Sequence, residues 1–260
     1  RVMQKSKHPN ISYIIDLLSD SSNIYIIEEY IPTSLFNLIE EKKKTFMEFT
    51  SRPIIFQVLQ AISYLHSIGF CHRDIKPHNI LIRDDGTIKL IDFGLSTPIN
   101  VTNVRCGSKY FFPPEVLLPM KHIAQSNTEK DKCSNLFDSN ERYEQNHTNT
   151  NIDGIKCDSW CCGITFFLIL TGKMPWSKMS IEQITTEKIQ YPLYLSNECI
   201  DFLDKLLTID PKKRITVKEA LQHKWILKDI NTYKDTSFNL PTNRLSSEKI
   251  EKILTEFQLL

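Results

Sequence analysis

The chain has 260 residues, 41% of them hydrophobic and 24% charged, which suffices for one large domain or two modest lobes with packed cores. Lys and Arg total 32 against 31 Asp and Glu, and the resulting formal charge of +1 gives no general attraction to nucleic acid or to anionic membranes. The longest apolar run, residues 163–170, is far shorter than the roughly 20 residues that cross a bilayer, so we expect a soluble, intracellular protein in the cytoplasm or nucleus.

Strands and helices are predicted in turn along the first part of the chain. Residues 11–31 hold two segments rich in β-branched and aromatic residues on either side of a polar turn, which predicts two strands. Residues 34–42 and 50–69 have the apolar spacing of helices, and the second pattern stops at Gly69, a residue type common just after a helix. Asp84-Asp85-Gly86 separates two further apolar segments and predicts a hairpin.

The second half of the chain alternates between polar and apolar segments. Residues 120–153 are rich in Asn, Thr and Lys, so we expect a largely disordered insertion. Residues 160–170 are apolar on every face and predict a buried central helix, and the seven cysteines of the chain, which lack a repeated CxxC spacing, should be structural thiols. Helical patterns recur at residues 196–208 and 216–227. Residues 246–257 have an amphipathic pattern, which fits either a helix packed on its own lobe or a docking or autoinhibitory segment.

Three short motifs follow one another along the chain. In order, they are His72-Arg73-Asp74-Ile75-Lys76-Pro77-His78-Asn79, Asp92-Phe93-Gly94 and Pro113-Pro114-Glu115. An ordered set of this kind arises by chance far more rarely than any one motif, so the risk of a false match is small. The set resembles the signature of eukaryotic protein kinases, and residues 5–228 resemble the catalytic domain of the serine/threonine branch, with a flavour of the calcium/calmodulin-dependent kinases.

The resemblance implies an α+β fold of the protein-kinase type. Residues 1–31 would be the remnant of a small β lobe with the hinge, and residues 32–228 would be a mainly helical large lobe that carries the insertion at about residues 120–153. Residues 229–260 would form a C-terminal extension that contains the amphipathic helix. The implied partners are protein substrates and ATP, with Mg²⁺ as the metal, and the oligomeric state stays open.

The resemblance also implies the residues of the reaction. Phosphoryl transfer requires a protein to align the substrate hydroxyl with the γ-phosphorus and to neutralise charge, with little covalent chemistry. Asp74 would accept or orient the proton of the substrate hydroxyl, and Lys76 would contact the γ-phosphate, as in serine/threonine rather than tyrosine kinases. Asn79 and Asp92 would supply oxygen ligands to Mg²⁺, a hard cation that prefers carboxylate and amide oxygens.

The nucleotide base would bind where the two lobes join. The backbone groups of Glu29, Tyr30 and Ile31 resemble the hinge that bonds the edge of adenine, and Leu81 would pack beneath the base. Glu28 would then stand at the gatekeeper position, where a charged residue should narrow the back of the pocket.

Four further positions resemble structural supports of the family. Asp158 resembles the central-helix aspartate that holds the catalytic loop, here the first motif at residues 72–79, and Glu115 would pair with Arg214. Ser108 resembles the residue that serine/threonine kinases place near the catalytic lysine.

The family's nucleotide clamp is missing from these residues. All seven glycines lie beyond residue 68, so no glycine-rich loop is present, and neither the strand lysine nor its helix glutamate can be found. We therefore expect a fragment of a longer kinase that binds ATP weakly and is nearly inactive alone. The alternative is a pseudokinase-like scaffold or binding module, against which the presence of all four catalytic and metal residues argues.

Regulation and substrate choice can be read from a few positions. Arg73 precedes the catalytic Asp74, and in the family such an Arg goes with control by a phosphate on the activation segment, here residues 92–115. Thr102 is the nearest acceptor. A segment held by packing alone is the alternative. Relatives that select basic residues upstream of the phosphosite carry acidic side chains at positions corresponding roughly to Ser34, His78 and Leu168. None of the three is acidic here, so we do not expect selection for Arg or Lys.

Overall fold

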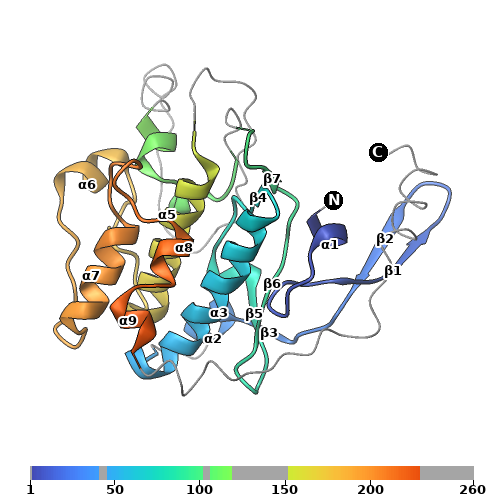
Figure 1. The fold of residues 1–260 in the computed structure, drawn as a ribbon, viewed down its shortest axis with the longest axis horizontal. Helices are drawn as coiled ribbons and strands as arrows, with labels where there is room; N and C mark the ends of the chain where they lie inside the picture. The colour runs from blue at the N-terminus through green and yellow to red at the C-terminus, as the bar shows by residue number, and fades with distance from the viewer. Residues whose placement is uncertain (1, 41–45, 102–105, 119–151, 229–260) are drawn as a thin grey trace.

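The structure, a computed structural model, describes residues 2–40, 46–101, 106–118 and 152–228. Thr102, nearly all of the expected insertion and the whole C-terminal extension with its amphipathic pattern lie outside these ranges. Figure 1 shows a large body built around helices and a two-stranded hairpin that projects from it. This mixture of helices and strands confirms the predicted α+β class.

The elements follow the predicted order. They are α1 (Val2–Lys5), β1 (Ile14–Ser19), β2 (Ile24–Glu28), β3 (Thr33–Ser34), α2 (Leu35–Glu40), α3 (Glu48–Ser67), β4 (Phe70–Cys71), the 3-10 turn η1 (Pro77–Asn79), β5 (Ile80–Ile82), β6 (Ile88–Leu90), β7 (Thr97–Pro98), the 3-10 turn η2 (Lys109–Phe111), α5 (Gly154–Thr171), α6 (Ile181–Thr186), α7 (Asn197–Leu206), α8 (Val217–Ala220) and α9 (Lys224–Leu227). The predicted N-terminal strands, the two helices that follow and the hairpin around Gly86 are confirmed. Helix α6 and the two-residue strands β3, β4 and β7 were not predicted.

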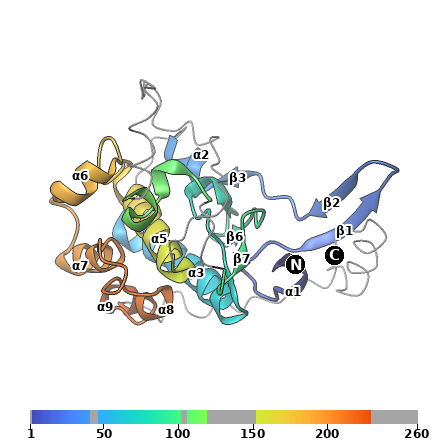
Figure 2. The same ribbon diagram turned by 90° about the horizontal axis from the view of Figure 1, so that it is seen from above.

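Strands β1 and β2 form a hairpin that lies beside α1 and stands apart from the other helices in both views (Figures 1 and 2). The strands pair antiparallel, with Leu17 opposite Ile26. Tyr25 and Ile26 are about half exposed, at 48% and 55%. The hairpin joins the rest of the molecule beside Ile11, which forms a parallel bridge with Leu90 of β6.

Helices α3 and α5 contribute many residues to the main hydrophobic core of the described residues. The buried face of α3 includes Ile55, Leu59 and Ile62, at the spacing of one helical face. All but two of the 18 residues of α5 are buried, as its apolar pattern predicts. By length and composition alone α5 could cross a membrane, but 89% of it is buried inside the protein, as in a core helix. Gly163 allows close packing, because a Cβ at this position would lie 2.7 Å from the side chain of Leu207.

The start of α5 differs from the prediction. The helix begins at Gly154 rather than near residue 160, because the carboxylate of Asp153 accepts hydrogen bonds from the amides of Ile155 and Lys156 and caps the first turn. Ile152, just before this cap, is buried. Residues 152 and 153 therefore belong to the packed lobe and not to the expected insertion.

The pattern at residues 216–227 is not one helix but two. Thr216 and Glu219 form a capping box that starts α8, which ends after one turn. The ring of His223 then accepts a hydrogen bond from the amide of Trp225 and caps α9. The apolar spacing runs through both helices, so the sequence pattern alone could not locate the break.

Strand pairing brings two loops together and so forms the candidate site. Strands β3, β5 and β6 make a small sheet, in which β5 and β6 pair antiparallel with Ile80 opposite Leu90. The loop before β5 and the loop after β6 therefore leave the same end of this hairpin. Residues 72–79 and 91–94, which hold two of the three sequence motifs, are neighbours for this reason.

Candidate active site

Asp74 lies at the centre of a buried polar cluster, with its side chain only 1% exposed. Its Oδ1 accepts a hydrogen bond from Ser108 Oγ at 2.7 Å, and its Oδ2 accepts one from Asn79 Nδ2 at 3.1 Å and lies 3.2 Å from Lys76 Nζ. Burial acts to raise the pKa of Asp74, but the charge of Lys76 and the Ser108 hydroxyl outweigh it and the pKa is lowered. Asp74 is therefore an ionised acceptor at neutral pH.

Lys76 and Ser108 close the cluster around that carboxylate. Lys76 Nζ donates to Ser108 Oγ at 2.7 Å, and the same hydroxyl donates onward to Asp74. Ser108 can come this close because residue 107 is glycine with a φ of 122°, where a Cβ would stand 2.5 Å from the carbonyl oxygen of Arg73. The activation segment and the catalytic loop thus touch at a point that excludes any side chain.

Asn79 and Asp92 present oxygen atoms from the two neighbouring loops. The Asn79 amide nitrogen donates to the backbone oxygen of Asp74 at 2.7 Å as well as to its carboxylate, while the amide oxygen has no hydrogen-bond partner among the described residues. Asp92 is brought near because the amide of Ile91 donates to the carbonyl of Asn79 at 3.0 Å. Asp92 has a left-handed φ of 61°, a strained conformation for a residue other than glycine. An amide oxygen and a carboxylate are a donor set that fits Mg²⁺.

His72 joins the same two loops from inside. Its Nδ1 accepts a hydrogen bond from the amide of Asp74 at 3.2 Å, and its Nε2 lies 3.1 Å from the carbonyl oxygen of Ile91. Burial lowers the pKa of His72, so the ring is neutral and donates through Nε2. Its ring also meets that of Phe93 edge to face, with centroids 5.1 Å apart.

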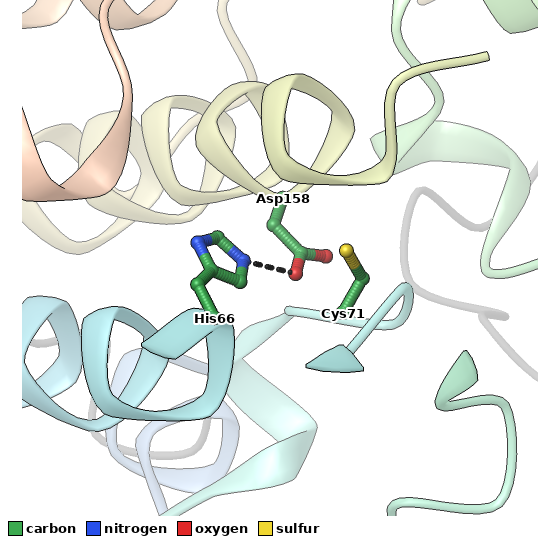
Figure 3. Close-up of side chains that lie close together, drawn as sticks. All are labelled: His66, Cys71 and Asp158. Carbon is green, nitrogen blue, oxygen red and sulfur yellow. Dashed lines mark hydrogen bonds and ion pairs between the residues drawn. The ribbon is translucent and has the colours of Figure 1, made fainter. Parts of the chain in front are cut away.

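Asp158 of α5 anchors the catalytic loop, as the sequence predicts (Figure 3). Its Oδ2 accepts a hydrogen bond from the amide of His72 and its Oδ1 one from the amide of Arg73, both at 2.8 Å. His66 of α3 adds a third contact, with Nε2 at 2.8 Å from Oδ2. Burial acts to raise the pKa of Asp158, but the hydrogen bond and charge of His66 and the other contacts lower it. The loop is thereby fixed to the two central helices.

His66, Cys71 and Asp158 also form a group whose ligand atoms lie within 4.8 Å of one another (Figure 3). We interpret the group as a loop anchor and not as a metal site. Both oxygens of Asp158 already accept hydrogen bonds from backbone amides. Burial raises the pKa of the Cys71 thiol, which disfavours the thiolate that a metal would require.

The predicted nucleotide residues lie around the β3–β5–β6 sheet. Glu29 and Ile31 belong to the segment between β2 and β3, and Ile31 is buried. Leu81 is half-buried on β5, directly opposite Lys89 of β6. The carboxylate of Glu29 forms ion pairs with Lys89 and with Arg83. No local pattern in the sequence indicates these pairs, because their members lie far apart in the chain.

Among the described residues, the positions expected to select a basic residue in the substrate, Ser34 and His78, carry no negative charge. The ring of His78 stacks on Phe36 with centroids 3.7 Å apart and an angle of 20°. Burial and the nearby charge of Lys76 lower the pKa of His78 to about 4, so this ring is uncharged at neutral pH. Leu168 must be removed from the residues expected to face a substrate, because it is buried in the core on α5.

Glu115 and Arg214 form the predicted pair. Two guanidinium nitrogens of Arg214 contact the two carboxylate oxygens of Glu115 at 2.7 and 3.0 Å. Arg214 is only 1% exposed, and its guanidinium lies 4.9 Å from the ring centroid of Trp160. This bidentate pair fixes the end of the activation segment to the large lobe.

Comparison with known proteins gives one consistent result. A family model described as "Protein kinase domain" matches residues 1–226. The chain is 31% identical over 242 residues to sperm motility kinase 3A of Mus musculus, an alignment that covers 90% of this chain and 42% of that protein. It is 29% identical over 233 residues to serine/threonine-protein kinase kin-29 of Caenorhabditis briggsae, with 87% of this chain and 25% of that protein covered. It is 32% identical over 248 residues to probable serine/threonine-protein kinase fhkA of Dictyostelium discoideum, with coverages of 86% and 40%. The chain thus spans less than half the length of these relatives.

Proposed function

This chain belongs to the protein kinase family, and we propose that it supplies the large lobe of an ATP-dependent protein serine/threonine kinase. In the reaction, a serine or threonine hydroxyl oxygen of a protein bonds to the γ-phosphorus of ATP, the bond from that phosphorus to the β–γ bridging oxygen breaks, and ADP leaves. The observation that carries the proposal is the buried cluster in which Lys76 and Ser108 hold the carboxylate of Asp74.

Asp74 would act on the substrate hydroxyl. Its lowered pKa keeps it ionised at neutral pH, and a carboxylate oxygen can accept more than the single hydrogen bond that Oδ1 receives from Ser108. A substrate hydroxyl that donates to this carboxylate has its lone pair directed at the phosphorus, and its proton passes toward Asp74 as the new bond forms. Positioned acid–base groups contribute rate factors of roughly 10² to 10⁴.

Lys76 would act on the transferred group. Its ammonium has three donors, of which one is used by Ser108 and a second faces Asp74, so the third can bond an oxygen of the γ-phosphoryl group. The ion pair with Asp74 at 3.2 Å sets the position of this charge. The same short cluster can therefore orient the hydroxyl and stabilise the negative charge of the phosphoryl group.

ATP and Mg²⁺ complete the proposed site. When bound, Mg²⁺ neutralises charge on the phosphates, and Asn79 and Asp92 would hold it through their side-chain oxygens. The backbone groups of Glu29 and Ile31 would bond the edge of adenine, with Leu81 packed beneath the base. The metal assignment is supported by the amide oxygen of Asn79, which accepts no hydrogen bond from any residue that the structure describes.

Nucleotide affinity is expected to be the weak property of these 260 residues. They contain no glycine before Gly69 and so no glycine-rich loop over the phosphates. We propose that the chain alone binds ATP weakly and transfers phosphate poorly, as a fragment of a larger kinase of calcium/calmodulin-dependent-like type would. The competing function is a pseudokinase-like scaffold that binds partners without chemistry.

The test is Asp74→Asn in the longest natural protein that contains this chain. With Mg²⁺, casein and ATP labelled at the γ-phosphate, we expect kcat to fall by roughly 10² to 10⁴ while the KM for ATP changes little. Asp201→Asn, at an exposed carboxylate on α7, is the control and should keep the parent rate. Unchanged transfer by Asp74→Asn would show the assignment of Asp74 to be wrong, and a parent protein that transfers nothing would favour the scaffold.

Substrate choice and location are further parts of the proposal. Uncharged His78 and Ser34 support substrates that need no basic residue upstream of the phosphosite. A peptide array with the same natural protein should therefore show no selection for Arg three residues upstream, and strong selection there would refute this point. Six cysteines in the described residues are free thiols, which supports a reducing cytoplasmic or nuclear location.

A further inference from the structure

Glu29 is an acidic residue that turns inward at the proposed hinge. Its side chain is 6% exposed, whereas the next residue, Tyr30, is 87% exposed. A carboxylate is buried only when other groups compensate the loss of water. The neighbours of Glu29 therefore indicate what this position does.

Two cations on one hairpin compensate the charge of Glu29. Lys89 Nζ lies 2.7 Å from Oε1, and Arg83 Nη2 lies 2.6 Å from Oε2, so each carboxylate oxygen faces its own cation. Lys89 is on β6 and its side chain is 4% exposed, while Arg83 follows β5 and its side chain is 44% exposed. One hinge carboxylate thus links both strands of the β5–β6 hairpin.

The Lys89 end of this link lies on a buried, hydrogen-bonded strand. Strand neighbours Ile88 and Leu90 are fully buried, and Asn10 bonds the backbone of both, with Nδ2 donating to the carbonyl of Ile88 and its own carbonyl accepting from the amide of Leu90. The ammonium of Lys89 also lies 5.1 Å from the ring centroid of Tyr13. A charge held on such a strand can position whatever is paired with it.

The pair is also next to the expected adenine site. Lys89 is directly opposite Leu81 in the antiparallel register of β5 and β6, and directly opposed residues project from the same face of a sheet. Leu81 is the residue assigned beneath the base, and Glu29 belongs to the segment assigned to its edge. The ion pair thus connects the segment at the edge of adenine with the strand pair beneath the base.

We propose that the buried Glu29–Lys89 ion pair, supported by Arg83, is a positioning device that fixes the hinge backbone relative to Leu81 for binding of the nucleotide base. This inference rests on the proposed function for its link to ATP. Its other part, that the pair holds the hinge backbone in place, rests on the ion pairs of Glu29 with Lys89 and Arg83. A buried ion pair is weak support for stability but can select one arrangement of the backbone, which is the role assigned here.

The test uses two readouts, the first on the whole 260-residue chain and the second on the longest natural protein that contains it. NMR relaxation gives the backbone order parameter at Glu29, Tyr30 and Ile31 and, for reference, in α5. Equilibrium dialysis with labelled ATP and Mg²⁺ gives the dissociation constant. In Lys89→Met we expect the hinge order parameters to fall from about 0.85, typical of a rigid backbone, to below about 0.6 with α5 unchanged, and ATP binding to be about tenfold weaker.

A double variant separates positioning from a general loss of stability. Lys89→Met combined with Glu29→Met removes both charges, so no unpaired carboxylate is left buried. It should keep the high order parameters of α5 and still show the low order parameters of the hinge. Lys205→Met, which breaks an exposed pair with Asp201 on α7, is the matched control and should change neither readout.

Each outcome decides the matter. Hinge order parameters that stay at the parent values in both Met variants overturn the inference, and so does an equal fall in the hinge and α5, because the pair would then serve stability alone. A flexible hinge with unaltered, measurable ATP binding also overturns it. A natural protein that binds no ATP at all counts against the proposed nucleotide site, while the order parameters still show whether the pair fixes the hinge.

Discussion

Asp158→Asn replaces one oxygen atom by a nitrogen group, and we expect it to lower the free energy of unfolding strongly. The carboxylate is fully buried and accepts hydrogen bonds from the amides of His72 and Arg73 and from the ring of His66. Hydrogen bonds to charged groups contribute about 1.5–3 kcal/mol each. The asparagine keeps one acceptor oxygen and turns an amide nitrogen, itself a donor, toward a backbone donor.

The size of the effect follows from that mismatch. One charge-assisted bond is lost and one backbone donor is left without a partner, which together cost about 3–5 kcal/mol. This is a large part of the 5–15 kcal/mol that is usual for the unfolding of a domain. Urea unfolding followed by circular dichroism at pH 7 measures the loss. Hydrogen exchange should also show that the amides of His72 and Arg73 lose protection before those of α5.

The pH dependence gives an independent check. The fold lowers the pKa of Asp158 below its ordinary value of 3.8, so the carboxylate stabilises the folded state above that value. This stabilisation is lost as the pH falls through the lower pKa of the folded state. The difference in unfolding free energy between the parent and Asp158→Asn should therefore shrink below pH 3.8.

The control for this prediction is Asp201→Asn. Asp201 is 40% exposed, so its loss should cost no more than about 1 kcal/mol. If Asp158→Asn costs no more than that control and the loop amides stay protected, the reasoning from three accepted hydrogen bonds is refuted.

Two further predictions concern the backbone and the acid range. Gly107→Ala should lower the free energy of unfolding in urea by about 1–3 kcal/mol more than Gly69→Ala, because both glycines have positive φ but only a Cβ at residue 107 would meet the carbonyl of Arg73. Equal costs would contradict this. Burial lowers the pKa of His8 and of His78 from 6.5 to about 4, so the unfolded chain takes up protons first and the free energy of unfolding should fall from pH 6.5 to pH 4. The fall should be shallower when His8→Gln is combined with His78→Gln, and parallel curves for parent and variant would show the assignment to be wrong.

Much of the fold and of the candidate site could be predicted because the signals are local. Apolar spacing predicts α3 and the buried nature of α5, and the Asp-Asp-Gly turn predicts the hairpin whose two ends carry the motifs. The antiparallel pairing of that hairpin then makes residues 74 and 92 members of one site. The proposed phosphoryl transfer could be predicted for the same reason, because the residues assigned to it are clustered along the chain.

The remainder depends on contacts that sequence spacing does not record. Two cations of the β5–β6 hairpin hold the hinge carboxylate of Glu29, and nothing near Glu29 in the chain indicates them. The break between α8 and α9 depends on a ring nitrogen of His223 that caps α9, and histidine is not among the residue types from which a helix cap is usually predicted. The resemblance to the family locates Leu168 along α5 but does not show whether its side chain is exposed, and the structure shows that it is buried.

The same contacts separate two properties of the proposed kinase. The catalytic loop is held by Asp158 of α5, by Ile91 after β6 and by Ser108 of the activation segment, all within the large lobe. Its geometry therefore does not depend on a glycine-rich loop. The base and phosphates of ATP, by contrast, would contact elements that these residues lack as well as the hinge fixed by Glu29. A defect in nucleotide affinity can thus coexist with an ordered catalytic loop, so exchange at residues 72–74 should stay slow even where ATP binding is too weak to measure.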